Sequence, residues 1–155
     1  MITFSKTTAV AAALLAQVAT GHAYAAEDIV GDWACVEQGS ADSEGLLGAG
    51  YQLGFGVSEQ QGPVFKGYVE WDEPRSEVSD SQMASRQIFK ESDGIVTFRV
   101  PIFGAFALEP GQFFFVEEGD PGHHIGKVLD QSTIEFVYLE SGANPLVAVR
   151  RCSRR

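Results

Sequence analysis

The sequence predicts an all-β protein, a single antiparallel up-and-down β-barrel of about eight strands. Beyond residue 25, no stretch of twelve or more residues shows the 3.6-residue periodicity of an amphipathic helix. Short apolar or alternating runs follow one another instead, separated by turn-forming Gly, Asp, Ser and Pro. Such tight connections favour antiparallel neighbours. The remaining length of about 130 residues suits one barrel, with a small β-sandwich as the alternative.

Nine runs predict strands, because each combines apolar residues with turn residues at its ends. They cover residues 29–37, 50–58, 64–71, 86–90, 95–100, 112–117, 124–129, 133–139 and 146–152. Asp130, Gln131 and Ser132 separate two of these runs and predict a hairpin turn. Residues 38–49 are polar and rich in Gly, which predicts a long loop at one rim of the barrel. Residues 72–85 are highly charged and predict a second loop or one short helical turn.

The first 25 residues have the order of a secretory signal peptide. Lys6 supplies a basic start, residues 9–18 are apolar, and Ala23, Tyr24 and Ala25 form a small-residue cleavage site. The apolar run is about half of the ~20 residues that a membrane-spanning helix needs. We therefore expect cleavage near Ala25, no stable membrane insertion, and a periplasmic or secreted domain of residues 26–155.

The chain has two cysteines, Cys35 near the start of this domain and Cys152 near its end. In an exported chain they most simply form one disulfide, whereas a redox-active pair normally needs C-x-x-C spacing. The bond would join the first strand to the last, which lie side by side in a closed barrel. By enclosing more than a hundred residues it would remove about 4 to 5 kcal/mol of unfolded-chain entropy.

Charge and motifs narrow the function classes. Acidic residues outnumber basic ones 21 to 11, so the net charge of -10 makes a nucleic acid an unsuitable partner. The sequence has no G-x-S-x-G, no H-E-x-x-H and no phosphate-binding Gly loop, and we expect neither an enzyme nor a cofactor. His123 and His124 are weak candidates for a metal site, because adjacent strand residues point to opposite faces. Exposed turn residues are the alternative.

Gly31, Asp32 and Trp33 form a G-x-W motif that resembles the signature of the calycin barrels, the lipocalins and avidins. In those families a Trp plugs the closed end of the barrel and an Arg from the last strand packs over it, a place that Arg150 or Arg151 would take here. The biotin site of avidins does not carry over, because it uses several Trp and this chain has two. Residues 126–142 resemble the C-terminal hairpin of secreted bacterial proteins whose function is not known.

Aromatic residues in the middle and late strands predict a pocket lined by apolar side chains. The candidates are Tyr51, Tyr68, Phe98, Phe103, Phe113 and Phe115. A completely filled barrel is the alternative, since eight strands leave room only for side chains or one small ligand. The leading hypothesis is an exported, non-enzymatic protein that binds a small apolar or aromatic molecule in the barrel mouth.

A second hypothesis makes the chain an acidic inhibitor of a basic protein such as a lysozyme-like enzyme. Residues 72–75 or 117–120 would then enter the basic cleft of that partner, steered by the negative net charge.

Overall fold

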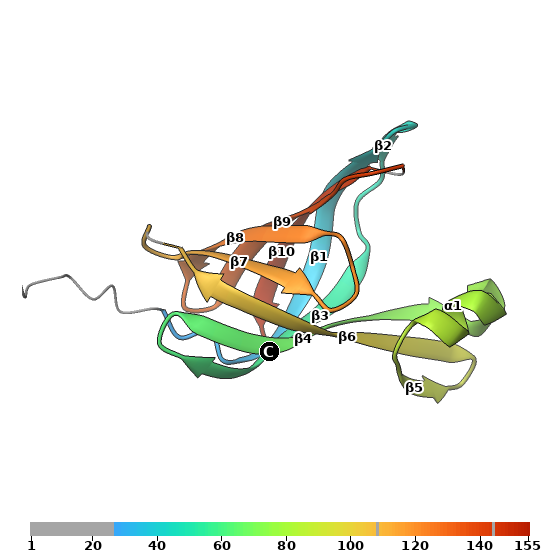
Figure 1. Ribbon diagram of the computed structural model, residues 1–155, viewed down its shortest axis with the longest axis horizontal. Helices are drawn as coiled ribbons and strands as arrows, with labels where there is room; N and C mark the ends of the chain where they lie inside the picture. Colours follow the sequence, from blue (N-terminus) through green and yellow to red (C-terminus); the bar gives the residue numbers. More distant parts are fainter. Residues whose placement is uncertain (1–26, 108, 144) are drawn as a thin grey trace, which may run out of the picture.

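Eight strands close into an antiparallel barrel, which confirms the predicted fold class (Figure 1). The structure, a computed structural model, describes residues 27–155 apart from 108 and 144, so the predicted signal peptide lies outside the described residues. The barrel strands are β1 (Gly31–Asp42), β3 (Gln52–Gln61), β4 (Val64–Pro74), β6 (Ile95–Phe106), β7 (Gln112–Glu117), β8 (His123–Asp130), β9 (Thr133–Glu140) and β10 (Leu146–Arg154). Each pairs with the next in this order, and β10 pairs with β1. The short strands β2 (Gly45–Leu47) and β5 (Ile88–Ser92) extend β1 and β6 outside the ring.

Cys35 and Cys152 close the ring covalently. They lie directly opposite each other where β1 pairs with β10, and they form the predicted disulfide. A disulfide is typical of an oxidising, extracytoplasmic environment. Within the part of the chain that the structure describes, no helix has the length and apolar character needed to cross a bilayer.

Burial alternates along the strands, as expected when every second side chain points into the barrel. On β1 the buried residues are Trp33, Cys35 and Glu37, and on β8 they include His124 and Val128. The inward face therefore carries polar side chains as well as the apolar core.

Three expected boundaries are wrong. Residues 38–42 continue β1 and residues 45–47 pair back on it, so the expected rim loop is largely a hairpin. The strand expected to end at residue 100 runs to Phe106, and Pro101 pairs with Tyr68 inside it. Residues 72–74 still belong to β4, and the expected helical turn is a 3-10 turn, Arg75–Glu77, followed by helix α1 (Asp80–Ser85).

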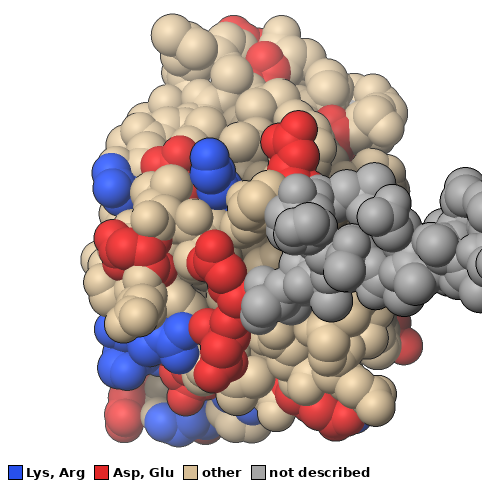
Figure 2. All heavy atoms as spheres, turned by 90° about the vertical axis from the view of Figure 1, so that its left-hand side faces the viewer, with Lys and Arg blue, Asp and Glu red and all other residues tan. Residues whose placement is uncertain are grey.

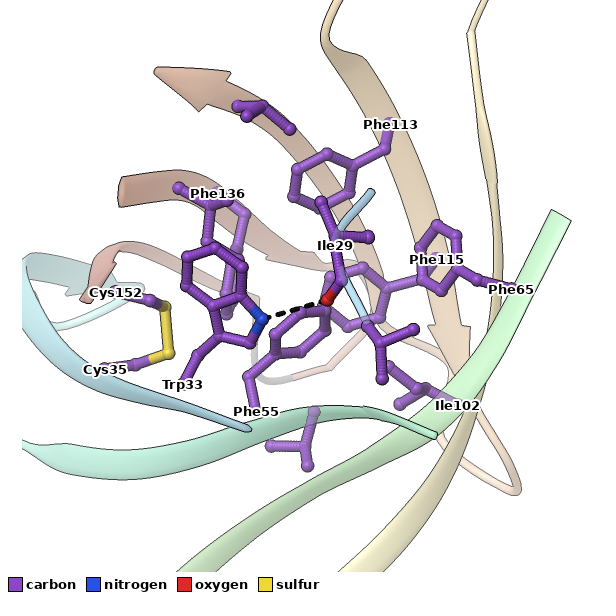
Figure 3. Packing of buried hydrophobic residues seen from close by; sticks show 14 of the residues in the cluster. Ile29, Trp33, Cys35, Phe55, Phe65, Ile102, Phe113, Phe115, Phe136 and Cys152 are labelled. Carbon is purple, nitrogen blue, oxygen red and sulfur yellow. Dashed lines mark hydrogen bonds between the residues drawn. A yellow bond between two sulfur atoms is a disulfide. The ribbon is translucent and has the colours of Figure 1, made fainter. Parts of the chain in front are cut away.

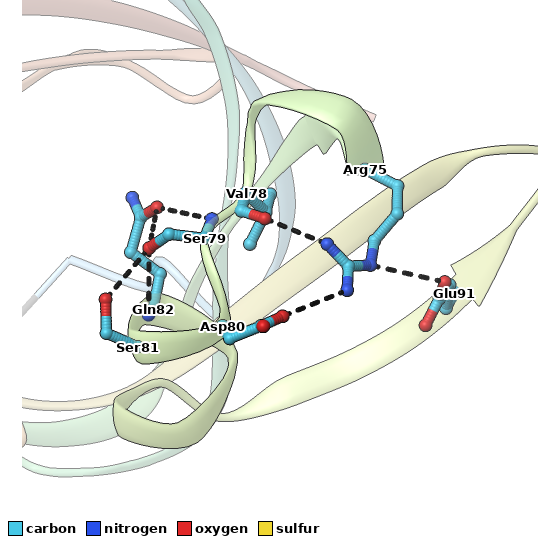
Figure 4. Close-up of polar contacts among 7 residues, drawn as sticks. All are labelled: Arg75, Val78, Ser79, Asp80, Ser81, Gln82 and Glu91. Carbon is cyan, nitrogen blue, oxygen red and sulfur yellow. Dashed lines mark hydrogen bonds and ion pairs between the residues drawn. The ribbon is translucent and has the colours of Figure 1, made fainter.

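The ends of β4 and β6, with β5 and α1, project from the barrel (Figure 1). This extension has a small core of its own, made by Val78, Val96 and Phe98. Ser79 caps α1 through a capping box with Gln82. Figure 4 shows this cap beside the Arg75 guanidinium, which donates to the carbonyl of Val78 and faces the carboxylates of Asp80 and Glu91.

Figure 2 views the barrel end opposite this extension. Lys and Arg side chains lie among Asp and Glu there and do not gather into one basic surface.

Candidate functional site

One half of the barrel interior is filled with rings. Trp33, Phe55, Phe113, Phe115 and Phe136 are each at most 1% exposed, and the Phe55 ring centroid lies 5.2 Å from that of Phe115 and 5.6 Å from that of Phe136. Figure 3 shows these rings packed around Ile29, whose carbonyl accepts a 3.1 Å hydrogen bond from the Trp33 indole. We call this the closed half of the barrel.

An arginine covers Trp33 at the outer end of the closed half, as the family resemblance implied, but it is neither Arg150 nor Arg151. The guanidinium of Arg154 lies 4.4 Å from the Trp33 ring. It donates hydrogen bonds of 2.7 to 3.0 Å to the carbonyls of Val30, Asp28 and Gln131. Arg154 therefore links residues 28–30 to the β8–β9 turn across the end of the barrel that Trp33 fills.

The other half, which we call the open half, contains charged side chains. Arg150 points inward from β10, and its side chain is 12% exposed. The nearest carboxylate oxygen, Glu37 Oε2, is 3.8 Å from Arg150 Nε, and this nitrogen has no hydrogen-bond partner among the described residues. Glu37 instead accepts a 2.7 Å hydrogen bond from the Ser40 hydroxyl. Burial lowers the pKa of Arg150, opposed by the charge of Glu37, but arginine remains charged. Nε of Arg150 is therefore a buried donor without an acceptor among the described residues, although the guanidinium carbon lies 5.3 Å from the centre of the Tyr138 ring.

The open half contains a second carboxylate, that of Glu117, which is hydrogen-bonded to His124. His124 Nε2 lies 2.8 Å from Glu117 Oε1, and the imidazole stacks on Phe115 with the ring centroids 4.0 Å apart. Because His124 is fully buried, desolvation lowers its pKa despite the neighbouring carboxylate. A neutral imidazole therefore donates its Nε2 proton to Glu117, which leaves Nδ1 without a partner among the described residues. His124 fixes the orientation of a carboxylate at the floor of the open half.

Tyr51 and Trp71 form the walls of the open half. The Trp71 indole donates to Glu73 Oε1 at 2.8 Å, and the same oxygen accepts from Arg86 at 3.1 Å. The Phe98 ring belongs to the core of the extension, and its centroid lies 5.6 Å from that of the Trp71 ring. Partial burial and the charge of Glu73 raise the pKa of Tyr51 to about 12, so its hydroxyl stays protonated. The extension thus holds an aromatic wall in place at the barrel mouth.

Three hollows meet at these walls. A small one of about 120 Å³ is lined by Tyr51, Trp71, Glu117 and Arg150, together with Leu53, Val69 and Tyr138. A second, of about 470 Å³, shares Tyr51, Trp71 and Arg150 and extends to Glu37 and Leu47. A third, of about 540 Å³, also borders Tyr51 and Trp71 but lies on the outer surface, since it is lined by the outward-facing Ala34, Val36 and Glu70. The second hollow is by itself large enough for a small organic molecule.

The predicted pocket residues are separated by the fold. Tyr51 lines all three hollows, but Phe113 and Phe115 belong to the closed half and Phe98 to the core of the extension. The expectation that Phe103 faces inward is wrong, since it is 53% exposed. The neighbouring Gly104 takes the inward position, and the Phe65 ring occupies the space that a side chain there would need.

Tyr68 lies on the outer surface of the barrel. Its ring covers Gly56, and its hydroxyl donates a 2.6 Å hydrogen bond to Asp32. Burial and this hydrogen bond raise its pKa to about 12. Tyr68 therefore contributes to the outer surface and not to the interior.

The two histidines point to opposite faces of β8, His123 outward and His124 inward. Within residues 27–155, apart from the two masked positions, no group of three or more His, Cys, Asp and Glu is arranged to hold a metal ion. In the acidic segments, the carboxylate of Glu73 is engaged by Trp71 and Arg86.

The open half contains residues that we had not assigned to a pocket: Glu37, Trp71, Glu117, Tyr138 and Arg150. The positions of the two cysteines could have identified two of these residues from the sequence, Glu37 and Arg150. Two bonded cysteines on neighbouring strands face the same side of the sheet, which here is the inside because both are buried, and side chains two residues away share that face. Glu37 and Arg150 are each two residues from a disulfide cysteine, whereas Arg151 is adjacent and points outward.

Comparison of the chain with protein-family models, curated proteins and solved structures finds no match in any of the three.

Proposed function

We propose that this protein is an exported, non-enzymatic binding protein that takes up a small molecule in the open half of a calycin-like barrel. The observation that carries the proposal is Nε of Arg150, a buried nitrogen with no hydrogen-bond partner among the described residues, on a side chain that lines two adjoining hollows. An unmatched buried donor is costly, so a ligand that supplies an acceptor gains affinity there.

Tyr51 and Trp71 favour a ligand with a planar or apolar body, because both residues border the two hollows that Arg150 lines. The polar floor favours a ligand with one acceptor group at its end. The proposed ligand class is therefore a small amphipathic molecule, an aromatic or apolar body with one hydrogen-bond-accepting group directed at Arg150.

The G-x-W motif and the stacked Arg154 support the calycin-like assignment, since they form the Trp plug and Arg cover that this resemblance implies. The disulfide supports export through the predicted signal peptide. Inhibition of a basic protein stays a prediction, and no observation at the acidic segments favours it over the pocket.

The test compares two fluorescent probes with the same aromatic body. 1-Anilinonaphthalene-8-sulfonate carries an acceptor group, whereas N-phenyl-1-naphthylamine lacks it. We expect the sulfonate probe to bind about tenfold more tightly, as one charge-assisted hydrogen bond would provide. Arg150→Met should remove this preference.

Arg151→Met is the matched control, because Arg151 lies next to Arg150 in the chain but points outward. This variant should keep the preference for the sulfonate probe. Equal affinity of the two probes for the unmodified protein, or the same loss in both variants, would contradict the proposed function. A native mass spectrum of the protein purified from its host would show whether a ligand remains bound.

A further inference from the structure

The outer surface of the barrel carries an apolar area on β4, β6, β7 and β8 that borders on β9. Its side chains are 37–53% exposed. We call it the outer apolar face, and its members are Val64, Phe103, Phe114, Val116, Ile125 and Leu139. The strand register brings five of these side chains together, because Phe103 pairs with Val116, Phe114 pairs with Ile125, and Ala105 lies between Val64 and Phe114. Leu139 lies at the border, separated from Val116 by the exposed His123.

This area is large for a surface that faces water. The outward side chains of antiparallel strands are normally polar. Six half-exposed apolar side chains present roughly 500 Å², near the upper limit for the largest apolar patch of a monomer. A standard interface buries about 800 Å² on each partner, somewhat more than half of it apolar. The outer apolar face therefore has the apolar area that one side of a stable dimer needs.

Charge identifies the partner. The chain has 21 acidic residues and a net charge of -10, so two copies repel each other over most of their surface. No carboxylate belongs to the outer apolar face, and at its border Glu59 is paired with Lys66 at 2.6 Å. Two copies can approach here with little repulsion. A basic protein would be attracted to the acidic surface elsewhere.

The face also contains a projection and a hollow that match each other. Phe114 projects from β7 and is 51% exposed. On the neighbouring strands, a hollow of about 320 Å³ is lined by Val64, Phe65, Phe103 and Gly104, together with Glu59, Gln61 and Lys66. A twofold axis exchanges the two features between identical copies, so one contact is made twice. An aromatic ring seated in an apolar hollow is the usual anchor of an interface.

We propose that the outer apolar face binds a second copy of this chain, with Phe114 of each copy seated in the hollow beside Phe103 of the other. This interface uses none of the side chains that border the two hollows of the open half. The two proposals can therefore fail separately.

The test measures the molar mass of the purified protein by size-exclusion chromatography coupled to light scattering. We expect the mass of two chains for the unmodified protein. Phe114→Glu should halve it, since a carboxylate would lose the ring contact with Val64 and Phe103 and would face Glu59 in the lining of the hollow, and Phe103→Glu should do the same from the other side of the contact. Both variants should keep the β-sheet circular dichroism and the probe binding of the open half.

Phe89→Glu is the matched control, because Phe89 is equally exposed, at 54%, but lies on β5 outside this face. It should leave the mass at two chains. Higher salt should increase the dimeric fraction, because it screens repulsion between the acidic copies and leaves apolar contact intact. A one-chain mass for the unmodified protein, or a dimer that persists in both Phe114→Glu and Phe103→Glu, would overturn the proposal.

Discussion

The two halves of the barrel interior satisfy their polar groups in different ways. In the closed half, Arg154 meets the Trp33 ring and three backbone carbonyls. In the open half, Arg150 on the same strand stands beside hollows and its Nε has no hydrogen-bond partner among the described residues. The same residue type therefore serves stability at one end of β10 and remains available at the other. An arginine inside a barrel indicates a binding site only where the fold leaves its donors unmatched.

The tryptophans offer the largest contrast between the halves. Trp33→Ala should lower the free energy of unfolding by about 3–5 kcal/mol, because it empties a fully packed site. Trp71→Ala should cost less than about 2 kcal/mol, because this ring is only partly buried against the extension. Urea unfolding with the disulfide intact measures both. Equal losses would show that the two ends are equally well packed.

Arg154 and Arg150 should also differ in how much each contributes to the stability of the fold. Arg154→Met should destabilise the fold by about 2 kcal/mol, because carbonyls of the chain start and of the β8–β9 turn lose a charged donor. Arg150→Met should cost less than this, because it loses no hydrogen bond of Nε but only the 3.8 Å approach to Glu37 and the contact with the Tyr138 ring. The midpoints of urea unfolding report the difference. A larger loss for Arg150→Met would mean that Arg150 is structural.

His124 gives the open half a dependence on pH. Its pKa is lowered by burial in the folded protein, so the unfolded chain takes up the proton first as the pH falls. The stability that this residue contributes is complete above the unfolded value of about 6.5 and is lost below it, at up to ~1.4 kcal/mol per pH unit. His124→Gln should reduce the slope of stability against pH below 6.5. The exposed neighbour provides the control, and His123→Gln should keep the original slope.

The smallest effect is expected in the extension. Ser79 accepts a hydrogen bond from the Gln82 amide, and Ser79→Ala should cost about 1 kcal/mol through loss of the helix cap. Ser81→Ala should cost less, because the Ser81 hydroxyl is hydrogen-bonded to that of Ser79 but does not itself cap the helix. Thermal unfolding followed by Trp fluorescence compares the two variants. Equal effects would mean that the cap does not support the wall formed by Trp71.

The sequence was sufficient for the barrel and for its closure. Short apolar or alternating runs and turn residues predict an antiparallel barrel of about eight strands, and two terminal cysteines predict where the ring closes. The strand ends were harder, because pairing continues β1 to Asp42 and β6 through Pro101 although local composition predicts that both stop. Partner strands supplied the hydrogen bonds that local propensity did not predict.

The candidate site was harder to predict than the fold, because it depends on which face of each strand is inward. Phe103 was expected inside and lies outside, since Gly104 leaves room for the Phe65 ring. Counting in steps of two from Cys152 would have placed Arg150 inside. No local pattern reveals that Trp71 is held at the mouth, because Glu73, Arg86 and Phe98 meet it only in three dimensions.

The central claim is that a ligand enters the open half and leaves the closed half unchanged. The two tryptophans of the chain, Trp33 and Trp71, report on the two halves separately. With 5-fluorotryptophan incorporated, the ¹⁹F NMR spectrum should contain one resonance from each, assigned by Trp71→Phe. Saturation with 1-anilinonaphthalene-8-sulfonate should shift the Trp71 resonance and leave that of Trp33 in place. A shift of the Trp33 resonance, or no shift of either, would contradict the account.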